Sequence, residues 1–143
     1  MVERDAGSGY VHRIRVRYGD CDMQGVVFNA NYFAYIDDAM DMWLQHALGE
    51  EYLDEFDYAV KKAAMEWASP ARAREVVDLR PVVTRWGRTS FDVRIGLSVG
   101  DRAVGEGELV LVSITPGGYE PAPVPERVRR ALSDGDASSS ISR

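Results

Sequence analysis

The sequence has little of several features that would mark particular classes of protein. Cys21 is the single cysteine among 143 residues, which excludes an internal disulfide framework and a metal site built from several cysteines. No apolar run approaches the roughly 18 residues that a membrane-spanning helix needs. The first ten residues lack the apolar stretch of a secretory signal peptide. We therefore expect a cytoplasmic protein without a membrane span.

An excess of positive charge is also missing. The chain has 17 Lys and Arg against 23 Asp and Glu, which gives a formal net charge of −6. An acidic chain binds nucleic acid poorly unless its cations gather on one face, so we expect no nucleic-acid partner. With 45% hydrophobic and 28% charged residues, the composition is that of a packed domain. The length suits one folded unit.

The two ends of the chain differ in composition from the middle. Residues 1–10 are polar and contain glycine, and residues 133–143 form a tail rich in Ser, Gly and Asp. Segments with so little to bury stay unstructured, so we expect a flexible N-terminus and a disordered tail. Residues 11–132 contain no linker and no internal repeat, and we expect a single domain there.

One segment, Asn31–Leu48, predicts a long helix. Its apolar residues recur at intervals of three and four and so share one broad stripe: Tyr32, Ile36, Ala39, Trp43 and Ala47, flanked by Phe33, Met40, Leu44 and Leu48. Asn29 or Asn31 is expected to cap the start of the helix, and Gly49 is expected to end it. So broad an apolar face needs a large, curved partner.

Alternating side chains predict several strands. Residues 91–99 alternate apolar and polar side chains, and residues 11–18 follow the same pattern. Gly100-Asp101 is a two-residue hairpin signal that leads from the first of these segments into a further strand over 103–115.

Two other segments are less regular. Residues 76–84 are rich in β-forming residues, with Pro81 expected at an edge or a bulge. Residues 58–68 contain good helix formers, but a sheet around the long helix needs another strand, so we predict strand there. With a short helix over 125–132, the prediction is an α+β domain whose long helix packs on an antiparallel sheet of about five strands.

The loop ahead of the predicted helix is the candidate site of chemistry. It is rich in turn formers, and it places two carboxylates, Asp20 and Asp22, just before a helix N-terminus. The free N–H groups and the positive dipole end of a helix suit a developing oxyanion, and Gly25 would let a carbonyl group approach closely. A carboxylate beside such a site can attack an activated acyl carbon or take a proton from water. The pattern favours acyl transfer.

The residues of this loop allow other interpretations. An aspartate ahead of a helix is commonly a turn former or a cap. Asp20 and Asp22 could form a metal-binding pair, but no His or Glu is adjacent to support one, and we expect no metal. Cys21 could be a nucleophile, but neither His12 nor His46 is near it in sequence, which favours a small buried cysteine.

The stretch GDCDMQGVVFNANYFAYIDDAMDMWL resembles the signature of the hotdog-fold acyl-CoA thioesterases. The branch is that of 4-hydroxybenzoyl-CoA thioesterase and the short-chain acyl-CoA hydrolases of bacterial cell-envelope operons. The matching residues are Gly19, Asp22, Gly25, Val26, Val27, Phe28, Asn31 and Tyr32. Two more stretches, AMEWASPA at 64–71 and WGRTSF at 86–91, are similar to the second strand of the family and to the turn after its third strand. The resemblance covers residues 11–132.

The resemblance implies a fold, an assembly and a reaction. A hotdog fold has a five-stranded antiparallel sheet wrapped around one long central helix, here Asn31–Leu48, and it makes residues 58–68 a strand. Such domains form homodimers or homotetramers, with active sites at the subunit interface. The implied reaction is hydrolysis of an acyl-CoA to free acid and CoA, with the coenzyme A thioester as substrate and no cofactor.

The match also assigns roles to residues. Asp22 occupies the position of the catalytic carboxylate, as nucleophile or general base. Backbone N–H groups near Phe28 and Asn29, aided by Gly25, would form the oxyanion hole. Phe28 and Tyr32 would line the acyl pocket, with core packing as the alternative for both rings. The family often has His or Tyr where this chain has Asn29, and Asn cannot serve as a base near neutral pH.

Coenzyme A carries phosphates, so its site needs local positive charge. Fifteen of the 17 basic residues are Arg, whose planar fork binds phosphate through two hydrogen bonds. By match with the family, Arg88 is the first candidate and Arg85 the second, with Gly87, Thr89 and Ser90 along the path of the pantetheine arm. A solvated surface face is the alternative for the arginines.

Other functions remain open at this level. The domain could bind acyl-CoA without turnover, or it could hydrolyse acyl groups carried by acyl-carrier protein. The presence of Asp22 argues against a pure binder, which has no need of an unpaired carboxylate beside the thioester. The sites of hotdog dehydratases have motifs of different spacing, and neither histidine is placed for them.

Overall fold

A computed structural model describes residues 9–141 of the chain. The elements follow in the order β1 (His12–Arg15), the 3₁₀ turn η1 (Tyr18–Asp20), α1 (Asn31–Leu48), the 3₁₀ turn η2 (Tyr52–Asp54), β2 (Asp57–Trp67), β3 (Val76–Trp86), β4 (Ser90–Val99), β5 (Arg102–Ile114) and α2 (Glu126–Ile141). The flexible N-terminus expected from the sequence falls mainly on residues 1–8, which lie outside the described residues.

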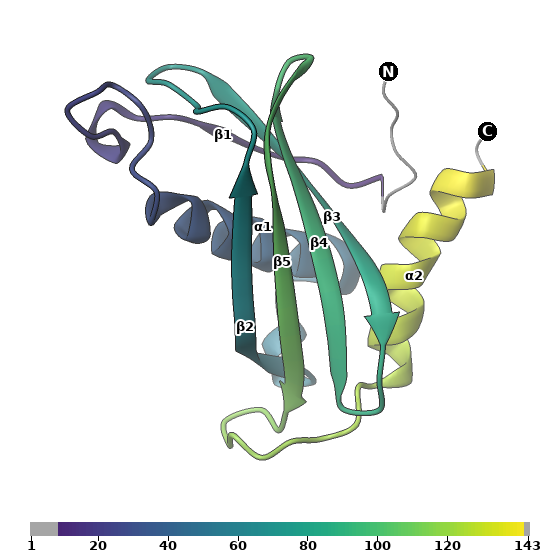
Figure 1. Cartoon of the computed structure of the whole chain (residues 1–143). Helices are drawn as coiled ribbons and strands as arrows, with labels where there is room; N and C mark the ends of the chain where they lie inside the picture. The colour runs from purple at the N-terminus through teal and green to yellow at the C-terminus, as the bar shows by residue number, and fades with distance from the viewer. Residues whose placement is uncertain (1–8, 142–143) are drawn as a thin grey trace.

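The five strands form one antiparallel sheet in the order β1-β3-β4-β5-β2 (Figure 1). The prediction of about five strands is therefore confirmed, and so is the strand over most of residues 58–68. That segment is strand despite its helix formers because β2 pairs with β5 along its whole length, and this pairing outweighs the weak local propensity. β1 has only four residues, whereas β2 forms an outer edge of 11 residues.

The predicted turn positions fit the sheet. Gly100 adopts φ +57° between β4 and β5, which a two-residue hairpin turn requires of its glycine. Pro81 lies on β3 opposite Ile95 of β4, beyond the stretch of β3 that pairs with β1. The pairing with β1 reaches Leu79, two residues before the proline.

Helix α1 lies across one face of the sheet (Figure 1) and buries the predicted apolar stripe against it. Its buried side chains are Tyr32, Tyr35, Ile36, Ala39, Met40, Trp43, Leu44 and Leu48. They share the core with buried strand residues that include Leu79, Val93, Ile95, Leu109 and Leu111. Each large apolar side chain buried in this way stabilises the fold by roughly 1.5–3 kcal/mol.

The ends of α1 fit one expectation and correct another. Gly49 ends the helix with φ +101°, as predicted. The N-cap residue is Ala30, whose side chain makes no capping hydrogen bond, so the prediction of an asparagine cap is wrong. The Asn31 side-chain amide donates instead to the carbonyl oxygen of Asp20, at 2.8 Å. The amide therefore ties the helix start to the preceding loop.

Helix α2 packs beside β3, at the far side of the sheet from β2 (Figure 1). It begins at Glu126, one residue after the expected start, and continues to Ile141, through most of the segment for which the sequence predicts a disordered tail. Val128 and Leu132 are fully buried, and the Arg129 guanidinium lies over the Trp86 ring.

No helix within residues 9–141 has the length and apolar character needed to cross a membrane.

Candidate functional site

Asp22 lies in a tight, exposed turn between η1 and α1. Its backbone N–H donates to the carbonyl of Val26 at 2.9 Å, and its own carbonyl accepts from the N–H of Gly25 at 2.9 Å. Gly25 has φ +80°, a conformation that costs a glycine little. The Asp22 carboxylate accepts the Gln24 N–H through Oδ1 at 2.8 Å. Its Oδ2 atom accepts no hydrogen bond from the residues that the structure describes, so this oxygen is available to a substrate.

Asp20, two residues earlier, has the opposite environment. Its side chain is buried and accepts the Tyr35 hydroxyl at 2.7 Å, the Arg17 backbone N–H at 3.1 Å and the Arg17 guanidinium at 3.2 Å. Burial opposes ionisation, but the hydrogen bonds from Tyr35 and Arg17 outweigh it and hold the pKa of Asp20 below its ordinary value of 3.8. Burial and the same contact raise the pKa of Tyr35. Asp20 thus anchors the loop, and Asp22 is the carboxylate left exposed.

The start of α1 offers fewer free N–H groups than the sequence suggested. The N–H of Phe28 donates to the carbonyl of Asp20 at 3.0 Å, so it is already used within the loop. The N–H groups of Asn29 and Ala30 donate to no acceptor within residues 9–141. They lie where the positive end of the helix dipole is strongest. These two groups are therefore the available donors for an oxyanion.

The two aromatic candidates differ in exposure. The Phe28 side chain is 53% exposed, so it can contact a ligand at the surface beside the helix start. Tyr32 is fully buried, and its hydroxyl accepts the Ala71 backbone N–H at 3.0 Å. Its ring packs edge-on against the ring of Trp67, which is itself half-exposed. Within a single chain, Tyr32 is therefore a core residue that holds the backbone of Ala71, and its ring is not exposed to a ligand.

The candidate coenzyme A residues lie on the hairpin between β3 and β4. Arg85 forms a two-point ion pair with Asp92, at 3.0 Å for each contact, and donates to Ser90 Oγ at 2.9 Å. The hydrogen bonds to Asp92 and the negative charge of this carboxylate raise the pKa of Arg85. The carbonyl of Thr89 accepts the N–H of Ser113 on β5, at 2.7 Å. This network leaves the Arg85 guanidinium less available to a phosphate than its exposure suggests.

Arg88 and Gly87 form the tip of this hairpin. Their carbonyls accept the guanidinium of Arg129, and the Arg88 carbonyl also accepts the Val124 N–H at 2.9 Å. The hairpin backbone is thus tied to α2 and to the segment before it. The Arg88 guanidinium forms no ion pair with a residue that the structure describes, so it is free to meet an anion.

Asp22 and Arg88 lie at opposite ends of the sheet. The Asp22 turn is joined to the connection before β3, because Val26 forms an antiparallel bridge with Arg72. The hairpin with Arg88 follows the other end of β3, whose 11 residues span about 33 Å at about 3.3 Å per residue. A single ligand would have to follow the whole of β3 to touch both residues in one chain.

Replacing Asp20 by Asn tests its anchoring role. We expect Asp20→Asn to lower the free energy of unfolding at pH 7 by about 1–2 kcal/mol, because hydrogen bonds to a charged acceptor are stronger than those to an amide. The pKa of Asp20 is lowered by folding, so its ionisation stabilises the protein above pH 3.8 and this stabilisation is lost as the pH falls through the lower folded value. Urea unfolding at pH 7 and pH 3 measures the difference, which should shrink at pH 3. The exposed Asp54→Asn is the control, and an Asp20→Asn variant as stable as this control at pH 7 would contradict the anchoring role.

Comparison with known proteins places this arrangement in a family. A sequence model of the thioesterase-like superfamily matches residues 16–132. The acyl-CoA thioester hydrolase YbgC of Escherichia coli O6:H1 is 28% identical over 120 residues, which cover 80% of this chain and 89% of that protein.

Solved structures of thioesterases have the same fold. A thioesterase superfamily protein from Jannaschia sp. CCS1 superposes with a TM-score of 0.84 at 20% identity, over 94% of this chain and 97% of its own. The gentisyl-coenzyme A thioesterase BH1999 superposes with a TM-score of 0.77 at 24% identity, over 87% of this chain and 99% of its own. The curved sheet and the helix across it thus form a hotdog fold. Because the sequence match begins directly after β1 and runs through α1 and strands β2 to β5 into α2, the chain belongs to the thioesterase-like superfamily.

Proposed function

We propose that the protein hydrolyses the thioester of an acyl-CoA to the free acid and CoA. The observation that carries the proposal is the exposed carboxylate of Asp22, held by a tight turn ahead of α1, where the N–H groups of Asn29 and Ala30 have no acceptor among the described residues. The superfamily match and the likeness to a protein named acyl-CoA thioester hydrolase support this choice of reaction. A carboxylate and an N–H pair are the groups that acyl transfer needs.

In the proposed reaction, the thioester carbonyl oxygen accepts hydrogen bonds from Asn29 and Ala30. The dipole of α1 adds to the stabilisation of the negative charge that develops on this oxygen. Asp22 then acts in one of two ways. Its carboxylate attacks the acyl carbon to form a mixed anhydride that water hydrolyses, or it takes a proton from a water molecule that attacks the acyl carbon directly. In both routes the C–S bond breaks, the CoA thiolate gains a proton and one water is consumed.

Three other loop residues shape the proposed site. Gly25 gives the turn its positive φ, and any side chain at this position would be strained. Phe28 presents an apolar surface beside the N–H pair, suited to an acyl group. Tyr32 acts indirectly in this proposal, because its buried hydroxyl holds the backbone of Ala71.

A second copy of the chain completes the site in this proposal. β2 is a long open edge with exposed apolar side chains at Val60 and Trp67, a surface suited to pairing with another strand. Antiparallel pairing of two β2 strands would bring the Trp67 end of one strand against the Asp57 end of the other. The β3–β4 hairpin lies at that opposite end, since the starts of β2 and β4 both pair with the last residues of β5. The homodimer would therefore carry the partner subunit's Arg88 toward Asp22.

The hairpin would then bind coenzyme A across the interface. Arg88 is the better phosphate ligand of the two arginines, because Arg85 is already held by Asp92. Gly87, Thr89 and Ser90 line the remainder of the hairpin, where the pantetheine arm would pass. Pairing of such dimers into a homotetramer would leave this arrangement unchanged.

The proposal is tested by measuring thiol release from a panel of aromatic, short-chain and long-chain acyl-CoAs. We expect turnover of at least one of them at a rate proportional to protein concentration. Faster release from the same acyl group on acyl-carrier protein would move the substrate assignment to the carrier-bound thioester. Calorimetric binding of acyl-CoA with no thiol release from any substrate would show a non-catalytic binding protein and would overturn the proposal.

A further inference from the structure

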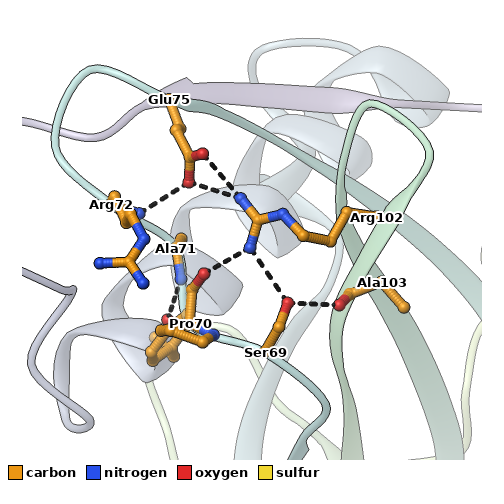
Figure 2. Close-up of polar contacts among 8 residues, drawn as sticks. Ser69, Pro70, Ala71, Arg72, Glu75, Arg102 and Ala103 are labelled. Atoms are coloured by element: carbon orange, nitrogen blue, oxygen red, sulfur yellow. Dashed lines mark hydrogen bonds and ion pairs between the residues drawn. The ribbon is translucent and has the colours of Figure 1, made fainter.

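One arginine outside the loop binds both ends of the connection between β2 and β3. Arg102, the first residue of β5, donates to Ser69 Oγ at 3.0 Å and to the Pro70 carbonyl at 2.6 Å. It also donates to both carboxylate oxygens of Glu75, at 2.7 Å each. Figure 2 shows the guanidinium between these groups. The single side chain thus fixes the two ends of the connection relative to each other.

The connection in turn holds the segment that follows Asp22. Glu75 Oε1 accepts the N–H of Arg72 at 2.8 Å, and Arg72 forms the antiparallel bridge with Val26. The carbonyl of Ala71 accepts the N–H of Val27 at 2.9 Å. A chain of direct contacts therefore runs from the carboxylate of Glu75 to the residues that close the Asp22 turn.

The same connection also contacts the segment between β1 and Asp22 and the start of α1. The Glu75 carbonyl accepts the Val16 N–H at 2.8 Å, and the Val16 carbonyl accepts the Arg74 N–H at 2.9 Å. The Ala71 N–H donates to the hydroxyl of Tyr32, in the first turn of α1. Both segments that flank Asp22 are therefore attached to this short stretch of chain.

Two further observations indicate that the connection between β2 and β3 is held in one conformation. Arg74 has φ +74°, a conformation that a residue with a side chain adopts only when its surroundings enforce it. Burial opposes ionisation of Glu75, but the Arg72 N–H and the Arg102 guanidinium outweigh it and lower its pKa. The two-point contact between Arg102 and Glu75 is only partly exposed, which makes it stronger than a surface ion pair.

We propose that Arg102 and Glu75 are positioning residues for the hydrolysis, because they fix the connection that holds the Asp22 turn against the start of α1. The inference rests on the proposed function. Loss of the two-point contact would let the turn move relative to the Asn29 and Ala30 N–H groups. A displacement of about 1 Å between reacting groups can cost about 100-fold in rate.

Steady-state kinetics of Arg102→Gln test this inference. We expect kcat to fall by about 10- to 100-fold with KM within about twofold of wild type, because the turn moves while the substrate-contacting groups remain. Arg102→Lys keeps the positive charge but loses the planar guanidinium that contacts several acceptors at once. Its kcat should therefore lie between those of wild type and Arg102→Gln. Arg94→Gln is the matched control. It removes the exposed Arg94–Glu106 ion pair between β4 and β5 and should leave kcat unchanged.

The outcomes separate this inference from the proposed function. A folded Arg102→Gln variant with wild-type kcat, or one that loses no more activity than Arg94→Gln, overturns the positioning role. A wild-type protein without thioesterase activity overturns the proposed function itself. If Arg102→Gln does not fold, Glu75→Gln decides. Its amide still accepts the Arg72 N–H but weakens the contact with Arg102, so an unchanged kcat overturns the inference and a several-fold lower kcat supports it.

Discussion

Replacing Asp22 by Asn should lower kcat for acyl-CoA hydrolysis by at least about 100-fold, the lower end of what a positioned acid–base group contributes. Asn has the same shape, and its side-chain oxygen can still accept the Gln24 N–H that Asp22 accepts at 2.8 Å. The turn should therefore stay in place. The amide can neither attack the acyl carbon nor take a proton from water, so chemistry is lost while the protein remains folded. Thiol release at saturating acyl-CoA gives kcat, and its concentration dependence gives KM.

A matched carboxylate elsewhere controls for the change in charge. Asp101 is exposed at the turn between β4 and β5, so Asp101→Asn removes one negative charge without touching the Asp22 turn. We expect its kcat to equal that of wild type. If Asp22→Asn retains more than half of the wild-type kcat, the carboxylate takes no part in the reaction and the assignment of Asp22 fails.

The rate loss should appear in kcat with KM nearly constant. Asp22 is exposed and, in the proposed reaction, acts at the reacting carbon, whereas the proposed binding groups for coenzyme A lie on the β3–β4 hairpin. Removal of an interaction made only in the transition state lowers kcat and kcat/KM together.

Arg88→Gln should raise KM and leave kcat nearly constant, since it removes a proposed ligand contact that is remote from the reacting carbon.

The regular elements could be predicted because they have local causes. The apolar stripe of α1 and the alternation in β4 follow from the two periodicities that pack one face of an element. The hairpin at Gly100 follows from a turn that needs positive φ. β2 had to be inferred from the needs of the sheet, because its own residues favour a helix and only pairing with β5 makes it a strand.

The parts that could not be predicted depend on long-range contacts. The N-cap of α1 is Ala30, and the side-chain amide of Asn31 donates to the Asp20 carbonyl, 11 residues earlier, instead of capping the helix. Arg102 and Glu75 are 27 residues apart in the sequence, and no motif links them. Only the fold shows that both contact the connection that is joined to the Asp22 turn.

The two aspartates of the loop show what the sequence motif could and could not predict about the site. Their spacing placed both carboxylates ahead of a helix, and the family resemblance selected Asp22. The burial of Asp20 against Tyr35 explains the selection physically, because a carboxylate that accepts three hydrogen bonds has little capacity left for a substrate. The distance between Asp22 and Arg88 had no signal in the sequence, since it depends on the bridge that joins the Asp22 turn to the connection before β3, at the far end of that strand from Arg88.

Gly105→Ala should have the largest effect on stability, a loss of about 3 kcal/mol or more. A Cβ atom at Gly105 would lie 2.3 Å from the Glu66 carbonyl oxygen and 2.7 Å from the Met65 side chain. The first contact is with backbone on the paired strand β2, so it can be relieved only by separating β2 from β5. That separation would break ladder hydrogen bonds at the end of the sheet next to the Asp22 turn.

Two other glycines provide a graded control for this prediction. A Cβ at Gly96 would meet no atom within 4 Å. Gly96→Ala should therefore change the free energy of unfolding by less than about 1 kcal/mol, and any change should be an increase. A Cβ at Gly107 would lie 2.7 Å from Ile36 Cδ1, the flexible end of a side chain on α1, so Gly107→Ala should cost an intermediate amount. Urea midpoints of the three variants measure the order. Equal midpoints for Gly105→Ala and Gly96→Ala would contradict the prediction. They would mean that β2 separates from β5 at this end without a cost in free energy. A strand so weakly paired could support neither a partner strand nor the Asp22 turn.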